Sequence, residues 1–242
     1  MNRMQYIKSL IFSLFMITTT VFFSTLALFL FLLPFKIRYG FVHWFAVWNV
    51  WLLKSLCGLN YEIEGQENIP KETAIIFAKH QSTWETMALQ LIFPPQTFVV
   101  KKELMWVPFF GWGLAALNPI AIKRGSGRSA IKQVVRQGIE RLKAGIWVVI
   151  FPEGTRVRPG QRIRYKLGGA ILAAKSGYPV VPVAHNSGEY WPKKQFLKKP
   201  GTIKIVIGPP IQSKDRKPEE ILSEAETWIE TTMDRISQPN AE

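Results

Sequence analysis

A histidine and a glutamate five positions apart form the first candidate for chemistry in this sequence. His80 follows the short, β-branched and apolar run 73–78, which is typical of a buried strand, and a helical pattern begins at Ser82. His80 therefore lies in a predicted strand-to-helix turn and Glu85 in the first turn of the helix, so the two side chains can meet. Such a pair would supply a general base and the group that orients it, without a Ser or Cys nucleophile between them.

The same stretch also has a purely structural interpretation. Ser82 and Glu85 have the spacing of a capping box, in which the glutamate accepts the first backbone N–H of the helix. A single histidine beside a strand is most often a hydrogen-bonded packing residue. Taken alone, this stretch leaves both catalysis and helix capping open.

A second candidate is the segment 150–156, Ile-Phe-Pro-Glu-Gly-Thr-Arg, at the end of another predicted strand. Ligands usually bind at the strand ends of an open α/β sheet. Gly154 allows the backbone to turn close to a ligand, Thr155 has a hydroxyl, and Arg156 has a forked donor that suits a phosphate. The alternative is a surface turn with a solvated arginine.

Positive charge gathers near these strand ends. The chain has a formal net charge of +14, which indicates an anionic partner: nucleic acid, an anionic membrane or a phosphorylated substrate. Between Lys123 and Lys166 there are twelve Lys or Arg residues, against Glu140 and Glu153. A run of charge is usually a solvated face, but here three separate strand ends each carry a cation.

The N-terminal part of the chain has the pattern of a membrane element. Residues 10–33 carry no charge and are long enough to cross a hydrocarbon core of about 30 Å, and no small-residue cleavage site follows them. Residues 39–53 are apolar again and rich in tryptophan, which suits either the membrane interface or packing against the first helix. We expect residues 1–56 to form an anchor, and we favour a shallow pair of helices over a single span because it keeps every basic group on the cytoplasmic face.

Residues 57–242 have the pattern of an α/β domain. Predicted strands lie at 61–64, 74–78, 97–100, 120–122, 147–151, 180–184 and 203–207. Helical patterns lie between several of them, and the clearest is the last, with Pro218 in its first turn and an apolar stripe after it. This alternation predicts a mixed, largely parallel sheet covered by helices. The single cysteine, Cys57, leaves no disulfide to form within the chain.

Four ordered segments carry a resemblance to one family. They are His80-x4-Glu85, then Lys101-x2-Leu104-x3-Pro108-x2-Gly111 with Arg124 following, then Phe-Pro-Glu-Gly-Thr-Arg at 151–156, and Tyr-Pro-Val-Val-Pro-Val at 178–183. Together they resemble the motifs of the 1-acyl-sn-glycerol-3-phosphate acyltransferases, over roughly residues 74–184. That family usually has Asp where this chain has Glu85, so the carboxylate is retained on a longer side chain. Asn118-Pro119 also stands near a position where many members have Gly.

The resemblance implies a role for each of these residues. His80 would take the proton from the free hydroxyl of a lysophospholipid as that oxygen attacks an acyl thioester, and Glu85 would hold the other ring nitrogen. Backbone N–H groups after His80, at the N-terminus of the helix, would stabilise the oxyanion. The phosphate of the acceptor would be held by Lys101, Arg124, Glu153, Gly154, Thr155 and Arg156.

The resemblance also implies the substrates, the partners and the compartment. No metal or cofactor is required, and the acyl donor would be acyl-CoA or acyl carrier protein. The partners would be the lipid bilayer, a lysophospholipid acceptor and the donor, with phosphatidic acid as the product of phospholipid synthesis. We expect the inner (cytoplasmic) membrane, with the catalytic domain facing the cytoplasm.

Other classes of function fit the sequence less well. It has no Gly-x-Ser-x-Gly elbow and no P-loop, and His43, His80 and His185 lack metal-ligand spacing. We interpret His185 as structural or as lining the site. Nucleic-acid binding is disfavoured by the membrane element and the absence of a binding motif. The remaining alternatives are an acyltransferase for another lysolipid, or a membrane-anchored lipid-binding protein without turnover, although pure binding needs no oriented base.

Overall fold

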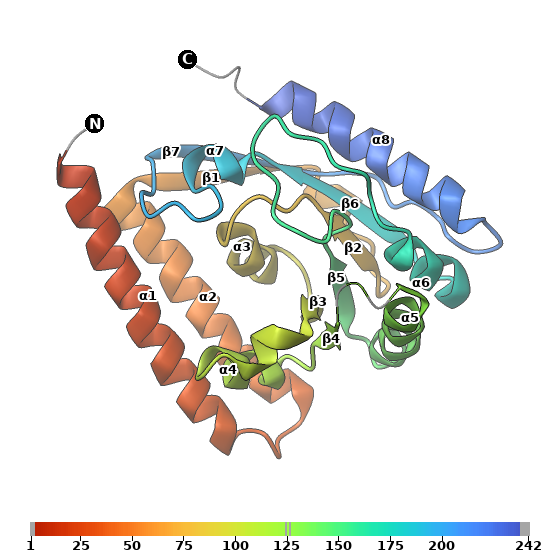
Figure 1. The fold of residues 1–242 in the computed structure, drawn as a ribbon, viewed down its shortest axis with the longest axis horizontal. Helices are drawn as coiled ribbons and strands as arrows, with labels where there is room; N and C mark the ends of the chain where they lie inside the picture. The colour runs from red at the N-terminus through yellow and green to blue at the C-terminus, as the bar shows by residue number, and fades with distance from the viewer. Residues whose placement is uncertain (1–2, 124, 126, 238–242) are drawn as a thin grey trace.

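The computed structural model describes residues 3–123, 125 and 127–237, and within these residues seven strands form one mixed sheet (Figure 1). The strands are β1 (Leu59–Glu64), β2 (Ile75–Ala78), β3 (Gln96–Lys101), β4 (Ile120–Ile122), β5 (Trp147–Ile150), β6 (Val180–His185) and β7 (Gly201–Ile207). The α-helices are α1 (Arg3–Phe29), α2 (Phe35–Cys57), α3 (Trp84–Ile92), α4 (Phe110–Ala116), α5 (Gly127–Lys143), α6 (Gly168–Ser176), α7 (Ser187–Tyr190) and α8 (Pro218–Ile236). Two short 3-10 helices are η1 (Gln66–Asn68) and η2 (Lys102–Trp106).

The order of the strands brings the predicted site segments to one edge of the sheet. The order is β1-β7-β6-β2-β5-β3-β4, and all neighbours are parallel except β6 and β7. The carboxyl ends of β2, β5, β3 and β4 therefore lie side by side. The prediction of a mixed, largely parallel sheet is confirmed, and each predicted strand is present.

Two hydrophobic cores cover the two faces of this sheet. Along β2, Ile76 and Ala78 face a core that includes residues of α2 and α3, whereas Ile75 and Phe77 face a core that includes residues of α5, α6 and α8. Figure 1 shows α5, α6 and α8 on the side of the sheet away from α1 and α2. Because all four β2 side chains are buried, each stabilises the fold, by about 1.5–3 kcal/mol for the larger ones.

Helix α2 is longer than the predicted segment 39–53. It begins after Pro34 and ends at Gly58, whose φ of 70° is the left-handed conformation that closes many helices. One face of α2 is buried in the first core, with Ala46 and Leu53 fully inaccessible. Its tryptophans Trp44, Trp48 and Trp51 are exposed on another face. The helix thus packs against the domain and still presents an aromatic surface.

Helix α1 contacts the domain at both of its ends. Near its start, the Gln5 amide donates to the carbonyls of Cys57 (3.1 Å) and Lys198 (2.5 Å). Near its end, α4 packs so closely that a Cβ on Gly113 would lie 2.5 Å from Ser24 Oγ. Among the described residues, α1 is the one helix long and apolar enough to cross a membrane. It nevertheless lies along the side of the domain (Figure 1).

Candidate active site

The two predicted site segments form a single site around His80. His80 lies in the turn between β2 and α3, and its imidazole stacks on the Phe151 ring with centroids 4.0 Å apart and planes 15° apart. The Glu153 carboxylate accepts the backbone N–H of His80 (3.1 Å), and the Val157 N–H donates to the His80 carbonyl (2.7 Å). The loop after β5 therefore fixes the ring and the backbone of His80 together.

Glu85 holds both His80 and the turn that precedes helix α3. Its Oε1 lies 2.8 Å from His80 Nδ1, and the carboxylate also accepts the N–H groups of Gln81 (3.0 Å) and Ser82 (2.9 Å) and the Ser187 hydroxyl (3.1 Å). Complete burial opposes ionisation, but the hydrogen bond from His80 and the neighbouring imidazoles lower the pKa of Glu85 to about 2. Glu85 is therefore an anion at neutral pH, and the same carboxylate contacts His80 and accepts the Ser82 N–H that the spacing of Ser82 and Glu85 predicts.

This arrangement fixes the tautomer of His80 and corrects one expectation. Because Nδ1 faces an ionised carboxylate, Nδ1 carries the ring proton and Nε2 is left as the acceptor. The backbone N–H groups of Gln81 and Ser82 were expected to stabilise an oxyanion. They already donate to Glu85, so these two groups do not serve that purpose.

A buried ionic cluster lies beneath the site. Lys79 is 1% exposed, and its Nζ lies 3.3 Å from Glu153 Oε1 and 2.6 Å from Glu230 Oε1, which also accepts the Tyr165 hydroxyl (2.8 Å). Burial raises the pKa of Glu153 to about 7, against the lowering effect of Lys79 and of the His80 N–H. Glu153, predicted as a phosphate-binding residue, thus lies buried behind His80, and its side chain does not line the cavity described next.

A cavity of about 380 Å³ opens beside His80. Its polar lining includes His80, Lys101 and Arg156. Much of the rest is apolar and comes from α1, α2, α3, β3 and α4, including Phe23, Phe45, Met87, Phe98, Leu114 and Leu117. An imidazole, two cations and apolar side chains therefore line one cavity, which suits a ligand with a phosphate and a hydrocarbon chain.

The structure describes two of the three cations predicted to bind the phosphate, Lys101 and Arg156. Lys101 ends β3 and is half-exposed, with its Nζ 3.6 Å from Glu103 Oε1. Arg156 follows β5 and is partly buried at the cavity wall. Arg124 lies outside the described residues. Two of the three strand-end cations are thus brought together with His80.

Gly154 and Thr155 lie in the turn between Glu153 and Arg156. Gly154 has φ 68°, and a Cβ added there would lie 2.6 Å from the Nζ of Lys166, which covers the turn. Thr155 is exposed, and its hydroxyl accepts a hydrogen bond from Lys193 Nζ (3.2 Å). Both residues therefore neighbour cations at the rim, although neither lines the cavity.

Asn118, which stands near a position where many members of the acyltransferase family it resembles have Gly, has a backbone conformation that Gly adopts readily. Its φ is 50°, a region that Asn tolerates better than most residues. Its carbonyl accepts hydrogen bonds from Thr97 Oγ1 and Arg141 Nε, both at 3.0 Å, and its side chain accepts one from Arg38 (3.3 Å). The loop between α4 and β4 is therefore tied to three other elements.

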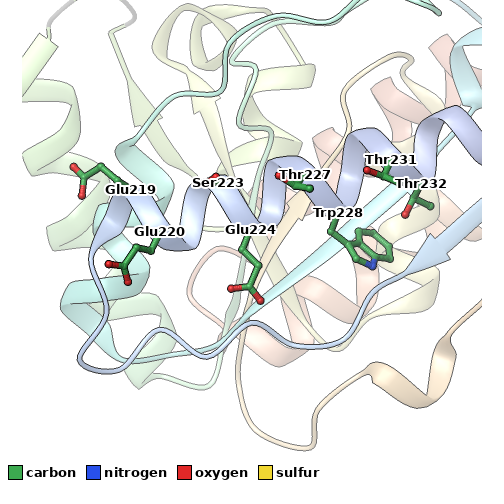
Figure 2. A pocket seen from close by; sticks show the side chains of 8 residues that line it. All are labelled: Glu219, Glu220, Ser223, Glu224, Thr227, Trp228, Thr231 and Thr232. Atoms are coloured by element: carbon green, nitrogen blue, oxygen red, sulfur yellow. The ribbon is translucent and has the colours of Figure 1, made fainter.

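A larger depression elsewhere does not fit an anionic substrate. It has a volume of about 850 Å³ and runs along α8, where Figure 2 shows Glu219, Glu220, Glu224 and Trp228 on one helix. It contains no predicted site residue, and its carboxylates would repel a phosphate. Among the described residues, no group of three or more His, Cys, Asp or Glu side chains is arranged to hold a metal ion.

Comparison with known proteins identifies the family of this chain. Residues 60–186, more than half of the chain, match the family model described as Acyltransferase. The chain belongs to the acyltransferase family. The matched region of this acyltransferase includes every predicted site residue, from His80 to Arg156.

Individual relatives of this acyltransferase extend the similarity over the whole chain. It is 45% identical over 243 residues to a 1-acyl-sn-glycerol-3-phosphate acyltransferase of Pseudomonas aeruginosa, covering 98% of this chain and 94% of that protein. A Saccharomyces cerevisiae protein of the same name is 31% identical over 77% of this chain and 63% of its own length. The crystal structure of the 1-acyl-sn-glycerophosphate (LPA) acyltransferase PlsC from Thermotoga maritima superposes with a TM-score of 0.80, at 26% identity, over 98% of this chain and 97% of that one.

Proposed function

We propose that this acyltransferase moves a fatty acyl group from an acyl thioester to the free hydroxyl of 1-acyl-sn-glycerol-3-phosphate, giving phosphatidic acid. The observation that carries the proposal is the His80–Glu85 pair at a cavity lined by two cations and many apolar side chains. The name of the Pseudomonas aeruginosa relative supports the choice of acceptor. The donor is acyl-CoA or acyl carrier protein, because both present the acyl group as a thioester.

The proposed transfer is direct. Nε2 of His80 takes the proton of the acceptor hydroxyl while the hydroxyl oxygen bonds to the thioester carbonyl carbon. Glu85, already ionised, stabilises the imidazolium that forms. The tetrahedral intermediate then collapses, the carbon–sulfur bond breaks, and the proton passes from His80 to the leaving thiolate. No covalent acyl-enzyme forms in this scheme.

Each cation has a proposed role toward the phosphate. Arg156 binds it with its forked guanidinium, and Lys101 and Arg124 add positive charge. Thr155, with Lys193 at its hydroxyl, completes the rim, and the turn at Gly154 lets the backbone approach. We propose a different part for Glu153, which holds the His80 backbone, because a carboxylate would repel the phosphate.

The apolar part of the cavity suits a fatty acyl chain. Its walls come from the two N-terminal helices as well as from the sheet domain, with Thr20 and Phe23 of α1 and Val42 and Phe45 of α2 among them. A hydrocarbon chain placed there loses contact with water, which favours binding by about 0.8 kcal/mol for each buried methylene group.

We propose that α1 and α2 anchor the protein as a shallow pair in the inner membrane, with the catalytic domain on the cytoplasmic side. Support comes from α1, which contacts the domain near its start through Gln5 and near its end through Ser24. A helix that leaves the domain to cross the bilayer would lose one of these contacts. Large exposed apolar side chains on α1 and α2 provide the lipid-facing surface.

Product analysis tests the proposed function. Membranes containing the protein are incubated with 1-acyl-sn-glycerol-3-phosphate and labelled acyl-CoA or acyl carrier protein, and the lipids are resolved. We expect labelled phosphatidic acid. Preferential labelling of another lysolipid would show that the enzyme acts on a different acceptor. Lipid binding without any labelled product would indicate a lipid-binding protein without catalytic activity.

A further inference from the structure

A further apolar surface lies outside α1 and α2, on η2, on the first turn of α4 and on the residues between them. Six large apolar side chains are exposed there: Leu104, Trp106, Val107, Phe109, Phe110 and Trp112. Trp106, at 78% exposed, is the most accessible of them. We propose that this surface, which we name the 104–112 surface, inserts into the phospholipid bilayer and forms the side through which a lipid reaches the cavity. This inference rests on the proposed function, because it assumes a lipid acceptor and a membrane anchor.

The exposure of the 104–112 surface comes from a tightly packed turn. A Cβ on Gly111 would lie 2.3 Å from the carbonyl oxygen of Met105, so η2 and α4 approach as closely as their backbones allow. The Gly111 N–H also donates to the Val107 carbonyl (2.8 Å). The apolar side chains are therefore held outward by a defined backbone.

The 104–112 surface adjoins the apolar helices. Helix α4 packs on α1 at Gly113 and Ser24, and the end of α1 and the turn after it expose Phe22, Leu26, Phe29 and Leu32. Figure 1 shows α4 beside the lower parts of α1 and α2, with α8 at the opposite side of the molecule. The exposed apolar surface is thus one-sided and runs from the helices onto η2 and α4.

The chemistry of the surface favours a bilayer as the occupant. Tryptophan and other aromatic side chains are enriched where a membrane meets water, and here they follow Lys101 and Lys102, whose charges suit anionic headgroups. The one carboxylate of this segment, Glu103, lies 3.6 Å from Lys101. A protein partner would need a surface to match, whereas the bilayer is already placed beside these residues by the proposed anchor.

Two residues connect this surface to the active site. Leu104 and Phe110 line the cavity and are also partly exposed. At these positions the apolar lining of the cavity is thus continuous with the exposed 104–112 surface. A lipid whose tail stays in the membrane can enter there without passing through water, and its phosphate would then meet Lys101, which lines the same cavity.

Spin labels at three positions test this inference. Three variants each carry one cysteine, at the exposed positions Leu14 on α1, Trp106 on η2 or Ser223 on α8, in a Cys57→Ala background. Each spin-labelled variant is reconstituted in vesicles of phosphatidylethanolamine and phosphatidylglycerol. Frequent collision of the spin label with oxygen indicates that the label lies in lipid. Frequent collision with a water-soluble nickel chelate indicates that the label lies in water. We expect labels at Leu14 and Trp106 in lipid and the label at Ser223 in water.

The other outcomes separate the inference from its foundation. A Leu14 label in lipid with a Trp106 label in water overturns the inference and leaves the anchor intact. Labels at both positions in water would contradict the anchor as well. Dipolar broadening at Trp106 would mean that a second copy of the chain covers this surface, which also overturns the inference.

An activity measurement supplies a second readout. Trp106→Glu places a charge on the surface without touching the cavity lining. We expect roughly tenfold lower activity toward an acceptor embedded in vesicles and unchanged activity toward a short-chain, water-soluble acceptor, because only the first depends on bilayer contact. Ser223→Glu, the matched control on α8, should change neither rate. Equal losses for both acceptors would show a structural defect and overturn the inference.

Discussion

Arg156 and Lys101 share a cavity with His80, but only the arginine has a fork that fits two phosphate oxygens. Arg156→Lys keeps the charge and removes that geometry. We expect the KM for the phosphorylated acceptor to rise roughly tenfold and the KM for the acyl donor to stay nearly unchanged. Steady-state kinetics with each substrate varied in turn measures this. Arg158→Lys, at an exposed neighbouring position, is the control. A selective rise in the KM for the acyl donor in Arg156→Lys would instead assign Arg156 to the phosphates of the donor.

Glu153 makes the stability of the fold depend on pH. Burial raises its pKa from 4.5 to about 7. A carboxyl with a raised pKa in the folded state favours folding fully below 4.5, and this contribution is lost as the pH rises through about 7. Glu153→Gln keeps an oxygen for the His80 N–H and removes the titration. We therefore expect wild type to lose stability relative to this variant between these two pH values.

Denaturant unfolding of the two proteins across this range measures the difference. Glu85 does not contribute to it, because its pKa is lowered to about 2 and its stabilisation is lost only as the pH falls from 4.5 toward that value. A constant difference between wild type and Glu153→Gln over the range would show that Glu153 is ionised throughout.

At the residue level, the sequence indicates the pair His80 and Glu85 but not the residues that hold it. The spacing of His80 and Glu85, with one in a turn and one in a helix, is enough to predict their contact. Phe151 and Ser187 come from the ends of other strands, and Lys79 pairs with Glu153 and Glu230, so no local pattern shows which atoms meet there. A lysine directly after a buried strand is one signal for Lys79, since a buried amine requires a partner.

At the level of elements, each predicted strand is present because its β-branched and apolar runs are bounded by turns. The ends of helices are less predictable. Helix α2 extends beyond 39–53 because Pro34 and Gly58, rather than the apolar pattern, determine where it begins and ends. The short helices η2 and α4 lack a periodic pattern, and only packing against α1 and the close approach at Gly111 explain them.

The helical walls of the cavity provide a prediction about acyl chains. Thr20 of α1 lines the cavity, and a larger side chain there would shorten the space for hydrocarbon. We expect Thr20→Phe to shift the preference toward shorter acyl donors, with roughly tenfold lower kcat/KM for long chains relative to short ones. Thr18→Phe, on the exposed side of the same helix, is the matched control. An equal loss for donors of every length would contradict this account of the cavity.

At the scale of the whole molecule, the N-terminal helices are part of the structure that forms the cavity beside His80. They share the first hydrophobic core with the sheet and supply walls of the cavity. The composition of the sequence distinguishes residues 1–56 from the rest of the chain. It does not reveal that α1 contacts the domain near both of its ends. Those contacts join residues far apart in the chain, such as Gln5 and Lys198.

The shallow anchor predicts where the two ends of the chain lie. Met4→Cys and Ser237→Cys, each in a Cys57→Ala background, are probed in sealed cells with a thiol reagent that does not cross the membrane. We expect both positions to be protected until the cells are permeabilised, because a shallow pair keeps both ends on the cytoplasmic side. Labelling of Met4→Cys alone would establish a single span, and labelling of Ser237→Cys would place the domain outside the cytoplasm.

We propose that His80, oriented by Glu85, is the base of a direct acyl transfer. The most direct test is the rate of phosphatidic acid formation by purified wild type and His80→Ala, with 1-acyl-sn-glycerol-3-phosphate and an acyl thioester. We expect the variant to be slower by roughly 100-fold or more, because general-base catalysis commonly supplies a factor of about 10²–10⁴. A folded His80→Ala variant that keeps a near-native rate would contradict the account.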